Sequence, residues 1–594
     1  MSRGMNDDEI LAELDELLAN AESDDDFEID DMFPHDDMQT LDTQCDDDEI
    51  FEMDIEPVQS STTSDIQPIT CTQRSKKKKL KVKTKPKARG RLTTPNFKWR
   101  RGPFQPKVHQ FDPSVSGIKK IEFDLNENSP IIDFFESFFT PSLLGKVAFE
   151  TNRYYQQNTE DQVLGDRDKR WYDTTSEEMY LFIAINMLMA RNKKLELREY
   201  WSTDALLYTP IFGQIMSRNR YQILLRYLHF TNNDHQVAGD RLYKIQMVLT
   251  EVKKNFRDAM IPFQNLVIDE SLLLWKGRLS FKQFIRTKRH RFGIKFFILC
   301  EVETDFILDF IIYTGKTTDI KACDINLGQS GAIVCTLFEG YLKKGRTLFT
   351  DNWYTSPLLS TYLHKNKTNS CGTVRKTRRG MPELKNKLKV GETQSLHTTK
   401  MLVMRWLDRR DVYMLTTCFS DKMLCTGKTD YENKNIRKLE CVIKYNESMG
   451  SVDKTDMLLS SVECVRKTVK WYKKVYFHLI DMSLLNAYSA YKQVTGKHPA
   501  LADFQLELIR QIIDRYRSKV KSPKFYPIKI DELLQTQKMH FLSEVPTTEK
   551  GKSVRRRCAL CNKNQKRKDT KYLCKECGVG LCAVPCFEIY HKKM

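Results

Sequence analysis

The sequence predicts a multidomain protein in which helical regions flank an α/β core and a small cysteine-rich metal module ends the chain. Three observations favour this fold class: helical apolar periodicity from about 118 to 262, short strand-like runs from Asn265 onward, and six cysteines within the last 37 residues. The length of 594 residues and the 40% apolar content are enough to fill several hydrophobic cores.

Charge is unevenly distributed along the chain. Residues 1–56 hold 23 acidic residues against Arg3, a net charge of −22, so the remaining residues carry +40 within the overall +18. A segment this acidic and this poor in aromatics cannot offset its ordering entropy, and we expect a disordered N-terminal region. The cationic body favours a polyanionic partner such as nucleic acid, although a solvated lysine-rich surface has the same composition.

A basic run between Arg74 and Lys107 includes four consecutive lysines at 76–79. It fits a nuclear import signal, a DNA-backbone contact or a solvated linker, and the first two are compatible. No run of 18 or more apolar residues occurs, and the N-terminus is acidic where a signal peptide would be basic and then apolar. We therefore expect a soluble, nuclear protein that has no membrane partner.

Helical signals dominate the region before Asn265. An apolar stripe follows Pro130, and Thr175 with Glu178 has the spacing of a capping box ahead of an apolar helix. A predicted helix over 218–230 alternates arginines with apolar residues, which favours an amphipathic surface helix over one that reads DNA. Further helices are expected over 471–491 and 503–516.

Three aspartates lie near the ends of predicted strands. Asp269 and Asp351 each follow a short apolar run, and Asp453 begins a predicted helix just after a strand expected over 439–445. Two divalent cations about 3.5–4 Å apart need oxygen ligands from separate elements, and one edge of a sheet can supply them. The pattern predicts phosphoryl transfer with Mg²⁺ or Mn²⁺, in which one ion activates the attacking oxygen and the other stabilises the leaving oxygen.

Two more acids lie beside these aspartates. Asp456 is three residues beyond Asp453 and thus on the same helix face, as a fourth ligand or a supporting partner. Glu270 faces away from Asp269 in a strand and is less suited to the site. Since most of the 78 acidic residues must be surface charges or caps, the interpretation depends on the set and not on one residue.

The C-terminal cysteines have the spacing of a zinc site. Two Cys-x-x-Cys pairs provide thiolates from tight turns, as tetrahedral zinc requires. Seven residues are obvious Zn²⁺ ligands, whereas two zinc ions need eight, so a second ion requires water or a ligand that the spacing does not reveal. The seven are Cys558, Cys561, Cys574, Cys577, Cys582, Cys586 and His591.

Six sequence blocks resemble the signatures of piggyBac transposases, in the family's order. The resemblance covers about 118–594. The blocks are Val267 to Leu274, Phe281 to Lys295, Asp351 to Ser356, Cys371 to Arg375, Tyr445 to Asp456, and Arg466 to Tyr472.

The resemblance implies an RNase H-like catalytic core of the DDE/D type with an inserted β-rich domain. An all-α dimerisation and DNA-binding domain would be assembled from both sides of this core, in a homodimer. The expected divisions are 1–117 (disordered, acidic then basic), 118–263 (helical, first part), 264–374 (catalytic, first part), 375–438 (insertion), 439–456 (catalytic, second part), 457–536 (helical, second part), 537–556 (linker) and 557–594 (zinc domain).

The resemblance also implies cut-and-paste transposition. Matching positions make Asp269, Asp351 and Asp453 the metal-binding residues and Asp456 an additional required aspartate. A nick would free a 3′-hydroxyl, a hairpin would follow, and the transposon end would join a TTAA target, with the zinc cross-brace recognising the terminal inverted repeats in double-stranded DNA. The family's paired glycines before the third aspartate are Gly450 and Ser451 here, which affects the turn expected to aim Asp453.

Basic and aromatic residues near the last block are candidates for DNA contact. Trp471 lies among Arg466, Lys467 and Lys470, where it could stack on or clamp transposon-end DNA. A core tryptophan on a basic helix is the competing interpretation. Two other functions also remain open for the chain: a domesticated DNA-binding protein that does not cut, and a metal-dependent nuclease that does not join ends.

Overall fold

The computed structural model describes residues 96–119, 123–159, 170–286, 291–321, 325–429, 435–464, 468, 470–520, 540–547 and 553–592. The chain divides into two compact units, Met1–Lys521 and Ser522–Met594, and each is described by itself. The acidic segment and the lysine run lie outside the described residues. Among the helices that are described, none combines the length and apolar content needed to cross a membrane.

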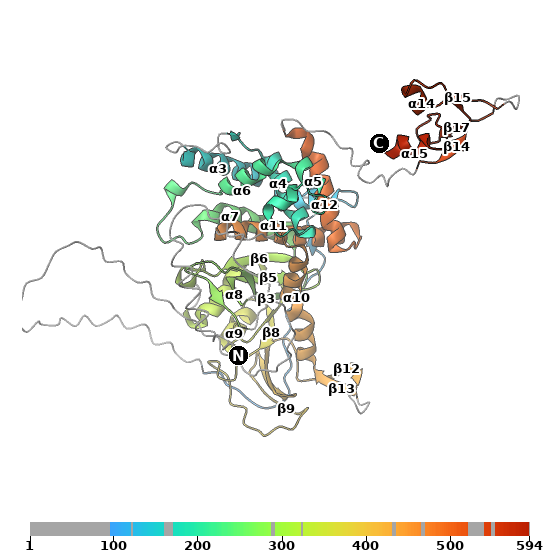
Figure 1. The fold of residues 1–594 in the computed structure, drawn as a ribbon. Helices are drawn as coiled ribbons and strands as arrows, with labels where there is room; N and C mark the ends of the chain where they lie inside the picture. The colour runs from blue at the N-terminus through green and yellow to red at the C-terminus, as the bar shows by residue number, and fades with distance from the viewer. Residues whose placement is uncertain are drawn as a thin grey trace, which may run out of the picture. The chain divides into compact units, whose positions relative to one another are not determined.

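Helices before and after the sheet in sequence pack together in the first unit (Figure 1). The apolar stripe after Pro130 is buried as predicted, with Phe134, Phe135 and Phe139 at 0% exposure. The expected helices over 471–491 and 503–516 are both present. The helices are α2 Ile131–Glu136, α3 Pro141–Thr159, α4 Ser176–Arg191, α5 Pro210–Ile215, α6 Arg218–Tyr227, α7 Gln246–Ala259, α11 Trp471–Thr495 and α12 Leu501–Tyr516.

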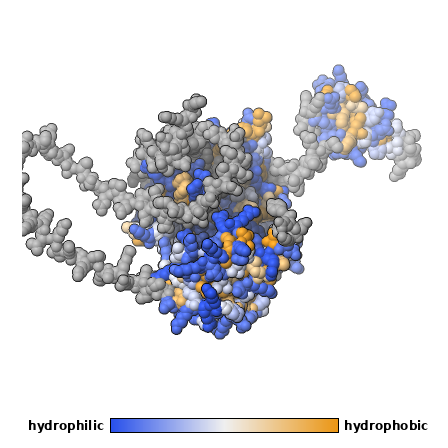
Figure 2. Space-filling view, turned by 90° about the horizontal axis from the view of Figure 1, so that it is seen from below, coloured by the Kyte–Doolittle hydropathy of each residue, from blue (hydrophilic) through white to orange (hydrophobic). Residues whose placement is uncertain are grey.

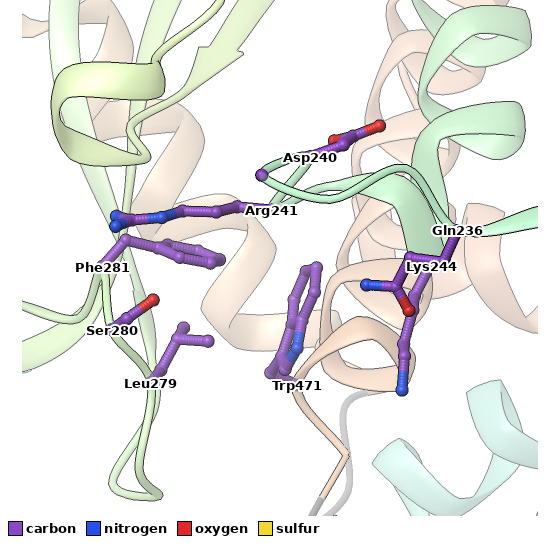
Figure 3. Close-up of a pocket in the computed structure, with 9 residues that line it drawn as sticks. Gln236, Asp240, Arg241, Lys244, Leu279, Ser280, Phe281 and Trp471 are labelled. Carbon is purple, nitrogen blue, oxygen red and sulfur yellow. The ribbon is translucent and has the colours of Figure 1, made fainter. Parts of the chain in front are cut away.

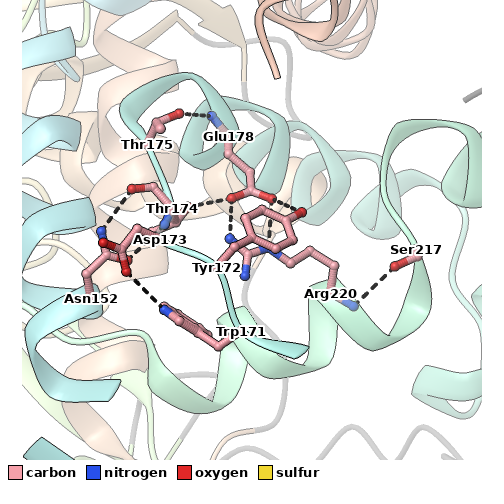
Figure 4. Close-up of polar contacts among 9 residues, drawn as sticks. All are labelled: Asn152, Trp171, Tyr172, Asp173, Thr174, Thr175, Glu178, Ser217 and Arg220. Carbon is pink, nitrogen blue, oxygen red and sulfur yellow. Dashed lines mark hydrogen bonds and ion pairs between the residues drawn. The ribbon is translucent and has the colours of Figure 1, made fainter. Parts of the chain in front are cut away.

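A buried ion pair joins α4 to α6 (Figure 4). Thr175 caps α4 by accepting a hydrogen bond from the Glu178 amide, which is half of the predicted capping box. The Glu178 carboxylate instead accepts two hydrogen bonds from the Arg220 guanidinium, at 2.8 and 2.6 Å, and a third from Thr174. The Tyr172 ring lies 3.6 Å from the guanidinium carbon. Arg220 therefore stabilises helix packing and is not available to read DNA.

A nine-stranded sheet forms the α/β core. The strand order is β4-β5-β3-β7-β8-β11-β10-β9, with β6 paired to β5. β3 is antiparallel to β5 and parallel to β7, and β7 is parallel to β8. The strands are β3 Asn265–Leu274, β4 Gln283–Phe284, β5 Phe292–Glu301, β6 Ile307–Ile312, β7 Thr347–Thr350, β8 Asn369–Thr373, β9 Thr393–His397, β10 Leu402–Leu407 and β11 Asp411–Thr416.

Further elements complete the first unit. α8 Gly328–Phe338 and α9 Pro357–Lys365 connect strands of the sheet, and β1 Gly117–Ile118 pairs with β2 Met260–Ile261. The region 375–438 supplies β9 to β11 to the main sheet, because β11 pairs with β8. It also forms a hairpin of β12 Met423–Thr429 and β13 Asn435–Leu439. Figure 2 shows a mainly hydrophilic face of this unit with small apolar patches.

The strand predicted over 439–445 is wrong. β13 ends at Leu439, and α10 Glu440–Val462 begins at the next residue. A short apolar run fits either a strand or a buried helix, and here the adjacent Cys441 and Val442 are both buried on a helix. Asp453 consequently lies within a 23-residue helix and not at its start, and Ser451 occupies that helix and not a turn.

The second unit is built from short elements. Residues 540–547, predicted as part of a linker, belong to this unit, because β14 pairs with β17. Its core cluster of buried residues is Cys558, Cys574, Leu581, Cys582 and Cys586. The elements are β14 Leu542–Glu544, β15 Arg556–Arg557, α14 Ala559–Lys563, β16 Asp569–Thr570, β17 Tyr572–Cys574 and α15 Cys586–Lys592.

Candidate active site and zinc centres

Two of the predicted aspartates lie side by side at one edge of the sheet. β3 and β7 run parallel, and Ile268 pairs with Thr350, so Asp269 and Asp351 are the residues that follow this pair. β7 ends at Thr350, but β3 continues to Leu274, so Asp269 lies within its strand and not at the strand end that the sequence predicted. The Asp269 Oδ1 accepts a hydrogen bond from the Glu270 amide at 2.9 Å. The Asp351 Oδ1 accepts from the Trp353 amide at 2.9 Å, which fixes this carboxylate in the loop after β7.

The other two aspartates come from α10. The Ser271 hydroxyl on β3 donates a 2.6 Å hydrogen bond to Asp456, which ties α10 to the strand that carries Asp269. Asp453 is exposed and lies three residues earlier on the same side of the helix. Ser271 and Asp269 share one face of β3, so this hydrogen bond places the α10 acids on that face.

Burial makes the charge at this edge costly. Burial, and next the charge of Glu270, raise the pKa of Asp351 to about 6, against the opposing effect of the Trp353 amide. Carboxylate oxygens are the ligands that Mg²⁺ and Mn²⁺ prefer, so the donor set suits hard divalent cations. The four aspartates do not form a converged ligand set. Among the described residues, three or more candidate ligand atoms lie within 4.8 Å of one another only in the C-terminal unit.

The strand next to Asp351 has no room for a side chain at Gly372. This residue pairs with Thr350, and a Cβ atom there would lie 2.3 Å from the Thr350 carbonyl oxygen and 2.3 Å from the Thr355 hydroxyl. Thr355 in turn donates a 2.8 Å hydrogen bond to the Asp351 carbonyl. Glycine at this position therefore permits the close strand packing that supports the Asp351 loop.

The C-terminal unit holds two separate groups of four ligands. Within the groups, ligand atoms approach to between 3.3 and 4.0 Å. Tetrahedral zinc bound by thiolates requires ligand atoms about 3.7 Å apart, so both groups suit zinc. The first group is Cys558, Cys561, Cys582 and Cys586, and the second is His540, Cys574, Cys577 and His591.

His540 is the eighth ligand that the sequence did not reveal. The pairing of Leu542 with Cys574 holds His540 beside β17, with its Nδ1 3.4 Å from the Cys574 Sγ and 3.3 Å from the Cys577 Sγ. His540 and His591 are the two histidines after residue 521. The unmatched count of seven ligands, together with this second histidine, was the signal that could have identified it.

Comparison with known proteins finds one family model that covers the aspartates and another that covers the zinc ligands. A family model described as "Transposase IS4" matches residues 131–488, more than half of the chain. The chain belongs to this family of transposases. A second model, described as a DDE_Tnp_1-like zinc finger, matches residues 536–592 and thus includes His540.

The relatives are piggyBac proteins. Human PiggyBac transposable element-derived protein 2 is 23% identical over 418 residues, which cover 68% of this chain and 67% of that protein. Human PiggyBac transposable element-derived protein 3 is 24% identical over 436 residues, 70% of each chain. The chain also shares the fold of the piggyBac transposase in a cryo-EM synaptic complex with hairpin DNA, with a TM-score of 0.61, 21% identity, and coverage of 80% and 100%.

In this piggyBac-family chain, Trp471 lines a cavity of about 280 Å³ (Figure 3). Its ring packs edge-on against Phe281, with centroids 5.4 Å apart. Arg241 and Lys244 add positive charge to the same cavity, which therefore combines aromatic faces with cations. The lining residues are Gln236, Gly239, Asp240, Arg241, Lys244, Leu279, Ser280, Phe281 and Trp471.

The predicted basic cluster around Trp471 is only partly available. Arg466 and Lys467 lie outside the described residues, and Lys470 directly precedes α11. Lys473 is buried and donates hydrogen bonds to the carbonyls of Leu225 and Arg226 at the end of α6, at 2.6 and 2.9 Å. Lysines that follow Trp471 on α11 thus anchor the helix and do not all face a partner.

Proposed function

We propose that this chain is a cut-and-paste DNA transposase that acts on transposon ends and joins them to TTAA targets. The observation that carries the proposal is the parallel pairing of β3 with β7, which sets Asp269 beside Asp351, while Asp456 is tied to β3 through Ser271. Metal-dependent phosphoryl transfer needs oxygen donors from separate elements, and β3, the loop after β7 and α10 each carry such donors here. Membership of the transposase family supports the same reaction class.

Each acidic residue has a proposed role. Asp269, Asp351 and Asp453 would hold divalent cations, Mg²⁺ or Mn²⁺, which would supply activation of the attacking oxygen and stabilisation of the leaving oxygen. Asp456 would fix α10 against β3 through the Ser271 hydroxyl. The Trp353 amide would keep the Asp351 carboxylate oriented at the sheet edge.

The proposed sequence of bond changes has two hydrolyses and two exchanges of one phosphodiester for another. Water breaks the bond that joins the transposon 3′ end to flanking DNA, which leaves a 3′-hydroxyl. This hydroxyl attacks the opposite strand, so a hairpin forms and the flank is released. Water then opens the hairpin, and the 3′-hydroxyl attacks a target phosphodiester, with the target strand's own 3′-hydroxyl as leaving group.

Other parts of the chain would bind and position DNA. The Trp471 cavity, with Lys470 beside it and Arg466 and Lys467 preceding it, would take end DNA, because aromatic rings stack on bases and cations bind phosphates. The zinc-bound C-terminal unit would recognise terminal inverted repeats, and the active form would be a homodimer in the nucleus. We assign the sheet to the RNase H-like type and extend the zinc domain to include His540. The second catalytic part then includes all of α10, Glu440–Val462, and the insertion 375–438 adds β9 to β11 to the main sheet.

The test is cleavage by the purified chain in Mg²⁺ or Mn²⁺, with candidate ends flanked by TTAA. Asp269→Ala, Asp351→Ala and Asp453→Ala should each abolish nicking while DNA binding is largely preserved. Glu303→Gln, an exposed acid in the turn after β5, is the matched control and should cut normally. Full nicking by any of the three aspartate variants would remove that residue from the mechanism.

A second candidate function is DNA binding without cleavage. The names of the human relatives describe them as transposable element-derived, which favours considering a host protein that retains the fold. A protein of this kind would bind the same DNA but would fail to nick it. The remaining open function, a metal-dependent nuclease, is tested by incubating the chain with a precut transposon end. A transposase joins this end to a TTAA target, whereas a nuclease does not.

A further inference from the structure

The face of β3 opposite to Asp269 carries an acid that the proposed reaction has not used. Glu270 pairs with Phe297 on β5, and Leu272 pairs with Lys295. Directly paired residues and their neighbours two positions away share a face of a sheet, so Glu270, Phe297 and Lys295 lie together. The register agrees with the expectation that Glu270 points away from Asp269.

The Asp351 loop nevertheless reaches this opposite face. The Trp353 ring is stacked on Phe297 with centroids 5.6 Å apart, and the Tyr354 ring meets Phe297 edge-on at 6.2 Å. The backbone amides of both residues donate to Asp351, at 2.9 and 3.4 Å. Asp351 is therefore held between the edge it shares with Asp269 and the face that carries Glu270.

Tyr354 places a buried hydroxyl among these acids. The side chain is 0% exposed, and among described residues its Oη has no hydrogen-bond partner. The amide of the same residue lies 3.4 Å from the Asp351 Oδ1, and its ring contacts Phe297, which is paired with Glu270. A buried hydroxyl without a hydrogen-bond partner is destabilising, so this hydroxyl suits a partner that is in place only in the metal-loaded site.

One cation lies over the same face. The Lys295 ammonium is 5.0 Å from the Phe297 ring centroid and 5.3 Å from that of Trp353. Lys295 is paired with Leu272, two residues from Glu270 on the same face of β3. Lys295 thus offsets part of the acidic charge, whereas the Tyr354 hydroxyl still needs an acceptor.

We propose that Glu270 is a further oxygen ligand for the divalent cation held by Asp351. When this cation is bound, the Tyr354 hydroxyl donates a hydrogen bond to the Glu270 carboxylate. The inference rests on the proposed function, because it assigns a residue to the same cation site. It makes the site two-sided, with Asp269 on one face of β3, Glu270 on the other, and Asp351 between them. Glu270 then supplies negative charge that balances the cation, and Tyr354 keeps its carboxylate oriented.

The test measures Mn²⁺ binding to the full zinc-loaded chain without DNA. The concentration of free Mn²⁺ is monitored by electron paramagnetic resonance. Glu270→Gln keeps the shape and removes the charge, and it should weaken binding at least about tenfold, as loss of a ligand or its support does. Glu303→Gln, exposed in the turn after β5, is the matched control and should bind as the unaltered chain does. Equal affinity in Glu270→Gln and Glu303→Gln would overturn the inference.

Tyr354→Phe tests the hydroxyl separately. Since the Oη lacks a partner among the described residues, its removal should leave thermal stability without Mn²⁺ unchanged or slightly raised, yet weaken Mn²⁺ binding. A large loss of stability without Mn²⁺ would instead make the hydroxyl structural and contradict its assigned role.

Two aspartate variants distinguish failure of the Glu270 inference from failure of the proposed function. Asp269→Asn and Asp351→Asn should both weaken Mn²⁺ binding if the proposed function is right. Weakening in these two without weakening in Glu270→Gln would reject the inference and leave the transposase proposal intact. Unchanged binding in all three variants would reject both.

Discussion

The aspartate edge and the cysteine-rich unit offer ligands to metals in opposite ways. In the C-terminal unit the cysteine ligands are themselves most of the buried core, together with Leu581. In the first unit the aspartates lie at the edge of a sheet whose interior is filled by apolar residues such as Val267, Ile268 and Phe296. The ligand atoms of the small unit have converged, whereas those of the large unit have not.

The difference shows what each metal does for the fold. A unit with so small a core depends on its zinc ions for folding energy. A carboxylate group at the edge of a large core is held by the protein instead, through Ser271, the Trp353 amide and the packing of Gly372. On the proposed function, metal would therefore be part of the structure in one unit and part of the reaction in the other.

Zinc removal is the strongest way to break this comparison. His540→Ala should lower the zinc content from two ions to about one per chain, and full chelation should unfold the C-terminal unit, because structural zinc is worth roughly 10–16 kcal/mol. The measurements are zinc content after dialysis and limited proteolysis of the full chain. His498→Ala, which alters an exposed histidine in the first unit, should keep two zinc ions. Resistance of 540–592 to protease after chelation would contradict the account.

The Glu178–Arg220 pair tests how a buried charge behaves when it is fully partnered. Glu178→Gln leaves the guanidinium buried without its counter-charge, so the free energy of unfolding of the first unit should fall by about 3–5 kcal/mol. Tryptophan fluorescence is the readout, since all seven tryptophans lie before residue 522. The double variant Glu178→Gln with Arg220→Met should lose less than Glu178→Gln, and an equal or larger loss would show that the charge is not responsible.

Asp351 is the contrasting case, a buried carboxyl near other acids. Its pKa is about 6 in the folded chain, against about 3.9 for an unfolded aspartate. The native state thus holds the extra proton between these values, and stability falls as pH rises from about 4 to 6. Without added divalent cation, Asp351→Asn should raise the free energy of unfolding at pH 7.5 by up to about 3 kcal/mol.

The pH dependence provides the control for this prediction. The difference between Asp351→Asn and the unaltered chain should shrink to roughly 0.5 kcal/mol near pH 4, where Asp351 is protonated in the folded chain and about half protonated in the unfolded chain. The measurement is urea unfolding followed by tryptophan fluorescence at several pH values. A stabilisation of the same size at pH 4 and pH 7.5 would rule out the carboxylate charge as its cause.

A pair of glycines gives the smallest expected effects. Gly372→Ala puts a Cβ against the Thr350 carbonyl, so the free energy of unfolding should fall by about 1–3 kcal/mol and nicking should weaken. Gly450→Ala has open space within α10 and should stabilise the helix by roughly 0.5–1 kcal/mol. Thermal unfolding of both variants measures these changes in stability. An equal change in the two variants would mean that crowding beside Asp351 is unimportant.

Much of this organisation could be predicted because periodicity and spacing are local. Apolar runs before Asp269 and Asp351 identified β3 and β7, and Thr175 marked the start of α4. The run after Leu439 could not be assigned locally, because it suits either a strand or a buried helix and packing decided for α10. The helix register then changed the setting of Asp453.

The residues that sequence reasoning missed depend on pairing between distant segments. His540 becomes a candidate ligand only when β14 pairs with β17, and no spacing within the cysteine block contains that information. Glu270 was set aside because it alternates with Asp269, which is correct for β3 itself. The role proposed for it rests on the Asp351 loop, in which Trp353 stacks on Phe297 on the face that Glu270 occupies.

The most direct test of the central claim is a crystal of the full chain soaked with Mn²⁺, with the ion located by anomalous scattering. The account predicts manganese at the carboxyl end of β7, beside the middle of β3, within coordinating distance of Asp269 and Asp351 and close to the α10 aspartates. Manganese bound elsewhere in the first unit, with this edge empty at saturating concentration, would contradict it.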